Sequence, residues 1–155
     1  MSNKQQLITV CALIHKKVDG VNSIFLAKRA ETKQFLPGVF ELPGGHVEFD
    51  EALTDALKRE IMEEFDAEIV VGDPFSAFTY TNNVKQSQSV EIVYFAQFVD
   101  EAQVNLKPED HSESVWVSEQ DIQKAYTATK GQDDEEFVIA RRGLDILNGQ
   151  PLRFS

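Results

Sequence analysis

Three glutamates gather in the stretch REIMEEF, which runs from Arg59 to Phe65. Residues three or four positions apart share a face of a helix, so Glu60, Glu63 and Glu64 would bring three carboxylates into one small volume. Like charges at that spacing repel each other, by about 1 kcal/mol per pair even in water. Mg²⁺ is bound by carboxylate oxygens and keeps several waters for chemistry. The spacing therefore indicates a site for a hard divalent cation.

The helix that would carry these acids has an unusual distribution of apolar residues. Wound at about 100° per residue, it spreads its apolar side chains over an arc of roughly 180°. These side chains are Ala52, Leu53, Ala56, Leu57 and Ile61. The three glutamates fall inside that arc, so we expect all three to turn inward, with Arg59 neutralising at most one of them. The alternative is a set of surface glutamates on a frayed helix end.

The composition limits the partners of the chain. Its 155 residues fit one domain, spanning residues 1–155, with a sizeable core. A net charge of −11 argues against nucleic-acid polymers and anionic membranes, and a phosphate substrate would be repelled unless a metal ion intervened. Cys11 lies in the apolar run LITVCALI and is expected to be a buried packing residue. The sequence shows neither a signal-like apolar core nor a run of membrane-spanning length, so we expect a cytoplasmic protein.

The segments around the acidic helix predict how it is held. Strands are expected at LITVCALIHKK, SIFLAKRA, Phe40–Leu42, EIVVGDPFSAFTYT, SVEIVYFAQFV and SVWVS, the first two forming a hairpin. Helices are expected at residues 50–65, at SEQDIQKAY and at residues 133–147. Strands with one inserted helix, followed by closing helices, indicate an α/β protein: a three-layer α/β/α sandwich with a central mixed β-sheet.

Two glycines precede the acidic helix. Gly44 and Gly45 follow Pro43, and we expect them to form a turn whose backbone can bend tightly and present carbonyls or amides to a ligand. Gly45 is accordingly a candidate contact for the substrate.

The stretch GHVEFDEALTDALKREIMEEFDA closely resembles the signature of the Nudix hydrolases, G-x5-E-x7-R-E-U-x-E-E-x-G-U, in which U is a bulky aliphatic residue. The matching positions are Gly45, Glu51, Arg59, Glu60, Ile61, Glu63 and Glu64. Asp66 stands where the pattern has glycine, and Ala67 where it has a larger aliphatic residue. The glycine position implies a left-handed helix end, which Asp tolerates at some cost. The flanking LAKRAETKQFLPGVFELPGGHVEF and SVWVS also resemble the family.

The resemblance implies a Nudix-type fold and the hydrolysis of a nucleoside diphosphate linked to another moiety, with water as nucleophile and Mg²⁺ or Mn²⁺ as cofactor. The implied metal ligands are Glu60 and Glu64, with the carbonyl of Gly44 and with Glu63 as a further ligand or water-activating base. Arg59 would orient a glutamate, and Glu51 would brace the loop against the helix. The expected catalytic set is Glu63, Glu64, Arg59 and Glu51.

Other residues are candidates with equally ordinary alternatives. Family members often add an acid from a late loop, and PEDHSES offers Glu109, Asp110 and Glu113 without choosing among them. Arg29 resembles a position that often faces the substrate phosphates, although a surface arginine would look the same. Phe35, Phe78 and Tyr80 could stack on a base or could belong to the core.

The leading substrate class is a nucleoside triphosphate, including oxidised or non-canonical ones, hydrolysed to the monophosphate and pyrophosphate. The stretch PGGHVEFDE resembles members with that activity. ADP-ribose or another nucleotide sugar is the alternative substrate, and a non-catalytic nucleotide-binding sensor is the alternative class. Motifs that mark the coenzyme A and diadenosine polyphosphate branches have no counterpart here. The sequence does not decide between a monomer and a homodimer.

Overall fold

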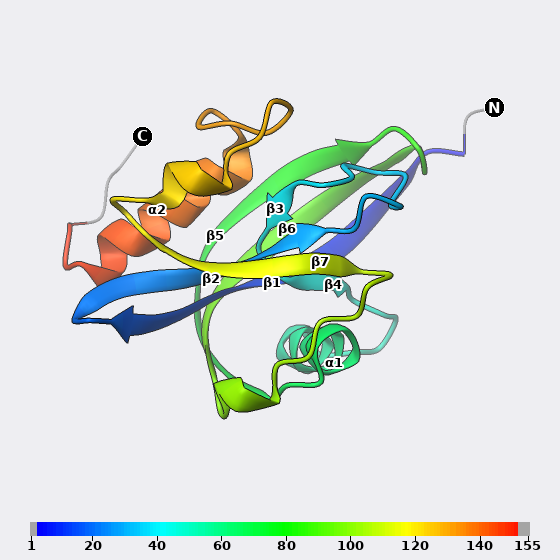
Figure 1. Ribbon diagram of the computed structural model, residues 1–155. Helices are drawn as coiled ribbons and strands as arrows, with labels where there is room; N and C mark the ends of the chain where they lie inside the picture. Colours follow the sequence, from blue (N-terminus) through cyan, green and yellow to red (C-terminus); the bar gives the residue numbers. More distant parts are fainter. Residues whose placement is uncertain (1–2, 152–155) are drawn as a thin grey trace.

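The computed structural model describes residues 3–151, which form one mixed seven-stranded sheet between two helices (Figure 1). The strands are β1 (Gln5–Val18), β2 (Val21–Arg29), β3 (Phe40–Glu41), β4 (Gly44–His46), β5 (Ile69–Asn82), β6 (Ser87–Phe98) and β7 (His111–Ser118). The helices are α1 (Leu53–Phe65) and α2 (Glu135–Leu147), with short 3-10 helices η1 (Glu101–Gln103) and η2 (Ile122–Ala125). Because α1 and α2 lie on opposite faces of the sheet, the predicted α/β/α sandwich is confirmed.

Strand β1 organises the sheet. The strand order is β3-β2-β1-β6-β5, with β4 added to β1 and β7 added to β2. The β1–β6 pair is parallel, and the other pairs are antiparallel. In this register Thr9 of β1 lies between His46 of β4 and Glu91 of β6. A long central strand thus links the glycine segment to the middle of β6.

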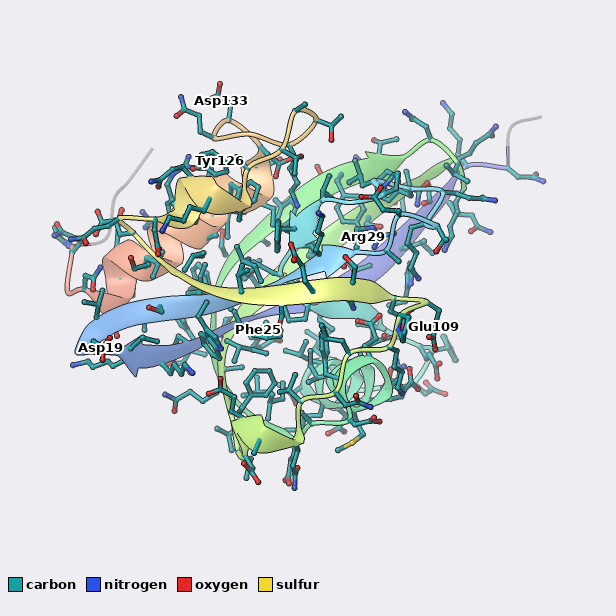
Figure 2. The ribbon with its side chains drawn as sticks, viewed as in Figure 1. Asp19, Phe25, Arg29, Glu109, Tyr126 and Asp133 are labelled. Atoms are coloured by element: carbon teal, nitrogen blue, oxygen red, sulfur yellow. The ribbon has the colours of Figure 1, made fainter. Side chains whose placement is uncertain are left out.

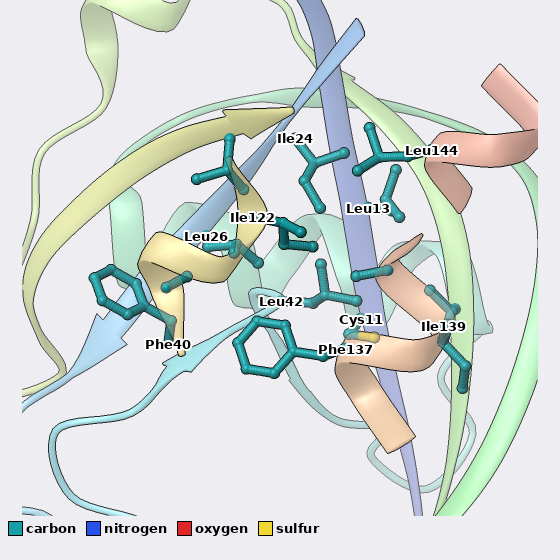
Figure 3. Close-up of a cluster of buried hydrophobic side chains, with 14 of the residues drawn as sticks. Cys11, Leu13, Ile24, Leu26, Phe40, Leu42, Ile122, Phe137, Ile139 and Leu144 are labelled. Atoms are coloured by element: carbon teal, nitrogen blue, oxygen red, sulfur yellow. The ribbon is translucent and has the colours of Figure 1, made fainter. Parts of the chain in front are cut away.

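Each helix covers its own hydrophobic core. The core under α2 combines side chains from β1, β2 and the helix, including Leu13, Leu26 and Phe137 (Figure 3). Cys11 is fully buried in it, as its apolar run predicts. The core under α1 contains Phe25 and Phe65, whose rings meet edge to face with centroids 5.6 Å apart. The two cores fix both helices against the sheet.

Helix α1 starts three residues later than its predicted start and ends as its pattern implied. Asp50 has φ 64°, a left-handed conformation that cannot be part of a right-handed helix. At the other end Asp66 is left-handed, with φ 53° and ψ 26°. Its carboxylate accepts a hydrogen bond from Asn105 at 3.0 Å and lies 3.4 Å from Nζ of Lys107. These contacts stabilise the aspartate at this position, and glycine could not make them.

Two local predictions were wrong. The segment SEQDIQKAY is only the 3-10 helix Ile122–Ala125, because nine residues are too few to sustain an α-helix without strong packing and Tyr126 returns to an extended conformation. Gly44 and Gly45 do not form a turn but lie in β4, paired with Cys11 and Val10. Within residues 3–151, neither α-helix has the length and apolarity needed to span a membrane.

Candidate active site

Strand β4 passes very close to β1 and α1, and a side chain on either of its glycines would collide with a neighbour. A Cβ atom on Gly44 would lie 2.6 Å from Cα of Cys11 and would also collide with the carbonyl of Val10. A Cβ atom on Gly45 would lie 2.7 Å from Oε1 of Glu60 and closer still to its Cδ. The glycine pair therefore lets Glu60, the first of the three helix glutamates, sit directly against the backbone of β4.

Arg59 connects the acidic helix to the loop before it. Its guanidinium donates two hydrogen bonds to Glu51, at 2.7 and 2.9 Å, and one to the carbonyl of His46 at 2.9 Å. It also reaches Glu60 at 3.0 Å and Glu63 at 3.3 Å. Arg59 thus contacts two of the three helix glutamates, but its single positive charge is shared with Glu51 and still neutralises at most one of them. The hydrogen bonds that Arg59 donates to Glu51 lower the pKa of Glu51 to about 2.

The three helix glutamates do not share one environment. Glu60 is mostly buried, with 15% of its side chain exposed, whereas 58% of the Glu63 side chain is exposed. The prediction that all three turn inward is therefore wrong for Glu63, which lies beside Arg59 at the solvent edge. Burial, together with the nearby charges of Glu41, Glu60 and Asp110, raises the pKa of Glu64 to about 8.

The structure distinguishes the acids of the late loop, which runs past α1 into β7 (Figure 2). Asp110 is half-buried, is paired with Lys33 at 3.0 Å and is close enough to Glu64 to raise its pKa. Glu109 is exposed, and Glu113 lies 3.9 Å from Lys28, which like Glu113 does not line the cavity described below. Of the three acids offered by the sequence, Asp110 is the one near the helix cluster.

A cavity of about 620 Å³ opens beside these acids. Glu60, Glu64, Gly44 and Gly45 line one part of it, which we call the acidic end. Its walls also carry the cations Arg29 and Lys33, which belong to β2 and to the following loop. The ends of β2, β3, β4 and α1 thus meet around one opening.

Arg29 is fixed in this wall and is not a free surface side chain. Its Nε donates to the carbonyl of Phe35 at 3.0 Å, and its Nη1 lies 3.2 Å from Glu41. Glu41 also lies 2.9 Å from Nε2 of the buried His111. Burial alone would raise the pKa of Glu41, but the hydrogen bond with His111 and the charges of Arg29 and Lys130 lower it.

Sequence reasoning missed Glu41 and His111. The sequence did hold one sign of Glu41: it is a charged residue in a short apolar strand immediately before Pro43-Gly44-Gly45. His111 faces it because β2 pairs with both β3 and β7: Glu41 lies opposite Ala27, and His111 lies opposite Arg29 on the other side of the strand. That proximity depends on tertiary pairing, which the local pattern does not contain.

The aromatic candidates divide between the cavity and the core. Phe78 is 9% exposed and packs in the core under α2, although it also borders the cavity. Phe35 and Tyr80 are half-buried on the cavity wall, with nearly parallel rings 6.2 Å apart between centroids. Both could therefore contact a planar group in the cavity.

The part of the cavity between β6 and the start of α2 is polar, and we call it the inner end. Its lining includes Thr9 of β1, Glu91 of β6, Glu136 of α2 and Lys130, which precedes α2, and sequence reasoning singled out none of them. Nζ of Lys130 lies 2.7 Å from Glu136 and 2.8 Å from the carbonyl of Phe40. A buried ion pair thus closes this end against α2.

The acidic end offers carboxylate oxygens, which are the ligands that a hard cation prefers. Within residues 3–151, no three Asp, Glu, His or Cys side chains are arranged to hold a metal ion. Mg²⁺, however, is commonly bound through one or two carboxylates together with waters and substrate phosphates. Glu60 and Glu64 supply two such carboxylates next to the tightly packed backbone of Gly44 and Gly45. The donor set therefore fits Mg²⁺ or Mn²⁺.

Comparison with known proteins identifies the family. The family model described as "NUDIX domain" matches residues 6–139, so the chain belongs to the Nudix family, whose members hydrolyse phosphoanhydride bonds in nucleoside diphosphate derivatives. The chain is 29% identical over 126 residues to the nucleoside triphosphatase NudI of Escherichia fergusonii, covering 76% of this chain and 86% of that protein. It is 41% identical over 59 residues to the uncharacterized Nudix hydrolase YfcD of Escherichia coli, covering 37% and 31%.

Solved structures agree with this assignment. A MutT protein from Methanosarcina mazei superposes with a TM-score of 0.75 and 27% identity, covering 97% of this chain and 100% of that one. An Ap4A hydrolase from C. elegans superposes with a TM-score of 0.71, covering 92% of this chain and 98% of that one, but at 19% identity it shows the common fold alone. The chain is thus a MutT-like pyrophosphohydrolase in fold and family.

Proposed function

We propose that this hydrolase acts on nucleoside triphosphates with Mg²⁺ as cofactor, or with Mn²⁺ as a substitute, and releases pyrophosphate and the nucleoside monophosphate. The observation that carries the proposal is that one cavity joins the Glu60–Glu64 pair to the polar inner end and also carries the rings of Phe35 and Tyr80 on its wall. A triphosphate and a base could therefore lie in the same opening. The name of the relative NudI, a nucleoside triphosphatase, supports the same substrate class.

The acidic end would bind the cofactor through Glu60, Glu64 and the carbonyl of Gly44. When bound, a divalent cation would polarise the phosphoryl oxygens and lower the pKa of a bound water. Arg59 holds Glu60 in place and is itself held by Glu51 and the His46 carbonyl. Because Glu63 lies at the solvent edge beside Arg59, we assign it to fixing Arg59 and not to a ligand role.

The reaction needs a water, a broken anhydride bond and a destination for one proton. The water oxygen attacks a phosphorus atom, the bond to the leaving pyrophosphate breaks, and the proton passes to a carboxylate on the cavity wall. Glu64 is the assigned acceptor because it faces the cavity at the acidic end. Arg29 and Lys33 line the same cavity and would bind phosphate oxygens, which offsets the repulsion expected from a net charge of −11.

A substrate panel tests the proposal. Wild-type protein is incubated with Mg²⁺ and the common ribo- and deoxyribonucleoside triphosphates, and ADP-ribose and a nucleotide sugar are assayed beside them. We expect equal amounts of monophosphate and pyrophosphate from at least one triphosphate. Faster cleavage of ADP-ribose than of every triphosphate would contradict the proposed substrate class while leaving the hydrolase assignment intact.

A further inference from the structure

Glu91 is a buried acid whose environment differs from that of the other acids in the cavity. It is 7% exposed, lies on the central strand β6 and lines the inner end of the cavity. Its Oε2 accepts a hydrogen bond from the hydroxyl of Thr9 at 2.6 Å, and the thiol of Cys11 is a second hydrogen-bonding neighbour. None of the ion pairs within residues 3–151 involves Glu91. A buried carboxylate without a cation is costly and calls for an explanation.

The neighbouring charges do not compensate Glu91. The titratable groups around it are Cys11 of β1, Tyr80 of β5, Glu41 of β3, Glu136 of α2 and Lys130 before α2. Lys130 is already paired with Glu136, whose carboxylate also accepts the backbone N–H of Leu42 at 3.2 Å. Arg29 and His111 are likewise already engaged by Glu41. Both neighbouring acids therefore have partners, and their charges act against ionisation of Glu91.

The distance between Glu91 and the acidic end matches the length of a nucleotide. Glu91 pairs in register with Thr9, and Thr9 pairs with His46, which adjoins Gly45 in β4. Two strand spacings put the backbones of Glu91 and His46 about 10 Å apart. The base of a nucleotide can extend that far from a phosphate held beside Gly45, with the ribose between them.

We propose that the inner end of the cavity receives the nucleobase, and that Glu91 reads its hydrogen-bonding edge as an uncharged carboxylic acid. This inference rests on the proposed nucleotide hydrolysis at the acidic end. An uncharged acid presents one donor beside one acceptor, whereas a carboxylate only accepts. Each common base has an edge with a donor next to an acceptor, but only guanine offers two adjacent N–H donors to a carboxylate. The protonation state of Glu91 therefore sets which bases can bind.

The environment of Glu91 supports the uncharged form near neutral pH. Burial, with the charges of Glu136 and Glu41, raises the pKa of Glu91 to about 7. Below that pH the acid can pair with any of the four common bases. Above it the carboxylate favours guanine over the others. The ratio of turnover with guanine nucleotides to turnover with the other nucleotides should therefore rise with pH. Comparing this ratio between pH values cancels the pH effects that all substrates share.

Two substitutions test this role. Glu91→Gln keeps one donor and one acceptor but cannot ionise, and Glu91→Leu keeps the volume without either. Glu68→Gln is the matched control, because Glu68 is exposed, lies outside the cavity and undergoes the same change from carboxyl to amide. For each protein, kcat and KM are measured for ATP, GTP, CTP and UTP with Mg²⁺ at about pH 6 and pH 8.5, values on either side of the Glu91 pKa. Thermal melts confirm that each variant is folded.

The expected results separate base recognition from a structural role. At the higher pH, Glu91→Leu should reduce the preference for GTP over the other three substrates by about tenfold in kcat/KM, mainly through KM, because the edge contacts are lost. Glu91→Gln should keep a spread like that of the wild type at the lower pH and lose the rise in the GTP ratio. The control should behave as the wild type.

Three outcomes would overturn the inference. The first is a wild-type protein whose ratio of GTP turnover to turnover of the other triphosphates does not rise from the lower to the higher pH, and the second is a Glu91→Leu variant that keeps the wild-type preference for GTP at the higher pH. The third is an equal loss of kcat for every substrate in both Glu91 variants, which would assign Glu91 a purely structural role. A wild-type protein that hydrolyses none of the triphosphates would instead overturn the proposed function on which the inference rests.

Discussion

The carboxylate of Glu60 occupies the space that a side chain on Gly45 would need. A Cβ atom built on Gly45 would lie 2.7 Å from Oε1 of Glu60 and nearer to its Cδ. Glu60 is held in that position by Arg59, which is itself tied to Glu51 and to the carbonyl of His46. The glycine and the glutamate of the family signature therefore depend on each other through packing.

Substituting Gly45→Ala should displace Glu60 and impair the response to metal. We expect only a small loss of stability, because the end of the Glu60 side chain can move aside, and a fall in turnover of more than about tenfold because a ligand has moved. Gly131→Ala is the control, since an added Cβ there meets nothing within 4 Å. Unfolding midpoints with and without Mg²⁺, measured beside turnover, check both expectations. Normal turnover in Gly45→Ala would show that the position of Glu60 is not critical.

Metal binding and intrinsic stability should respond in opposite ways to Glu64→Gln. In the metal-free protein, burial and the charges of Glu41, Glu60 and Asp110 raise the pKa of Glu64, so folding must keep a proton that the unfolded chain releases. The neutral amide has no such cost, so the variant should be at least as stable as the wild type. Added Mg²⁺ should raise its melting temperature less, because stabilisation scales as RT ln(1 + [L]/Kd) and Kd has risen. Melts in EDTA and across a Mg²⁺ titration measure this, with Glu68→Gln as control. Equal metal shifts in all three proteins would remove Glu64 from the ligand set.

Asp66→Gly should have a small net effect. Glycine fits the left-handed conformation better than aspartate, but the contacts with Asn105 and Lys107 are lost. These opposing contributions are each about 0.5–1 kcal/mol, so we expect the free energy of unfolding to change by less than about 1 kcal/mol. Denaturant titration measures it. Metal dependence should not change, and a large fall in metal affinity would show that Asp66 is itself a ligand.

The sequence predicts the fold and the acidic helix because both depend on local patterns. Alternating and continuous apolar runs identify the long strands, and the glycine position of the signature correctly predicts the left-handed end at Asp66. The predicted inward orientation of Glu63 is wrong because a helical wheel gives the direction of a side chain around the helix axis. It does not show how far the neighbouring strands and loops extend over that face. Glu63 lies at the edge of the packed face, where Arg59 and solvent reach it.

The inner end of the cavity could not be predicted from local pattern. Glu91 alternates within a strand as any surface residue would, and its burial arises only when β1, β5 and α2 close around it. The Lys130–Glu136 pair depends likewise on the docking of α2 against β3. Contacts between elements distant in sequence decide these features.

Glu91 should make stability depend on pH. Its pKa in the folded protein is about 7, raised above the ordinary value of 4.5 by burial. Between those two values the unfolded chain ionises while the folded protein keeps its proton, so stability falls as the pH rises. Glu91→Gln removes this loss, and relative to wild type it should gain about 2–3 kcal/mol between pH 4 and pH 8. Denaturant titrations at several pH values measure the gain, and a constant difference would contradict a raised pKa.

The central claim is that Glu60 and Glu64 hold the metal that hydrolyses a nucleoside triphosphate. The most direct test is turnover of the best triphosphate substrate, with pyrophosphate and monophosphate both quantified, for wild type and Glu64→Gln in Mg²⁺ and in excess EDTA. We predict that chelation abolishes wild-type turnover, that Mg²⁺ or Mn²⁺ restores it, and that Glu64→Gln loses a factor of about 10²–10³ or more. Undiminished turnover in EDTA, or wild-type turnover by Glu64→Gln, would contradict the account.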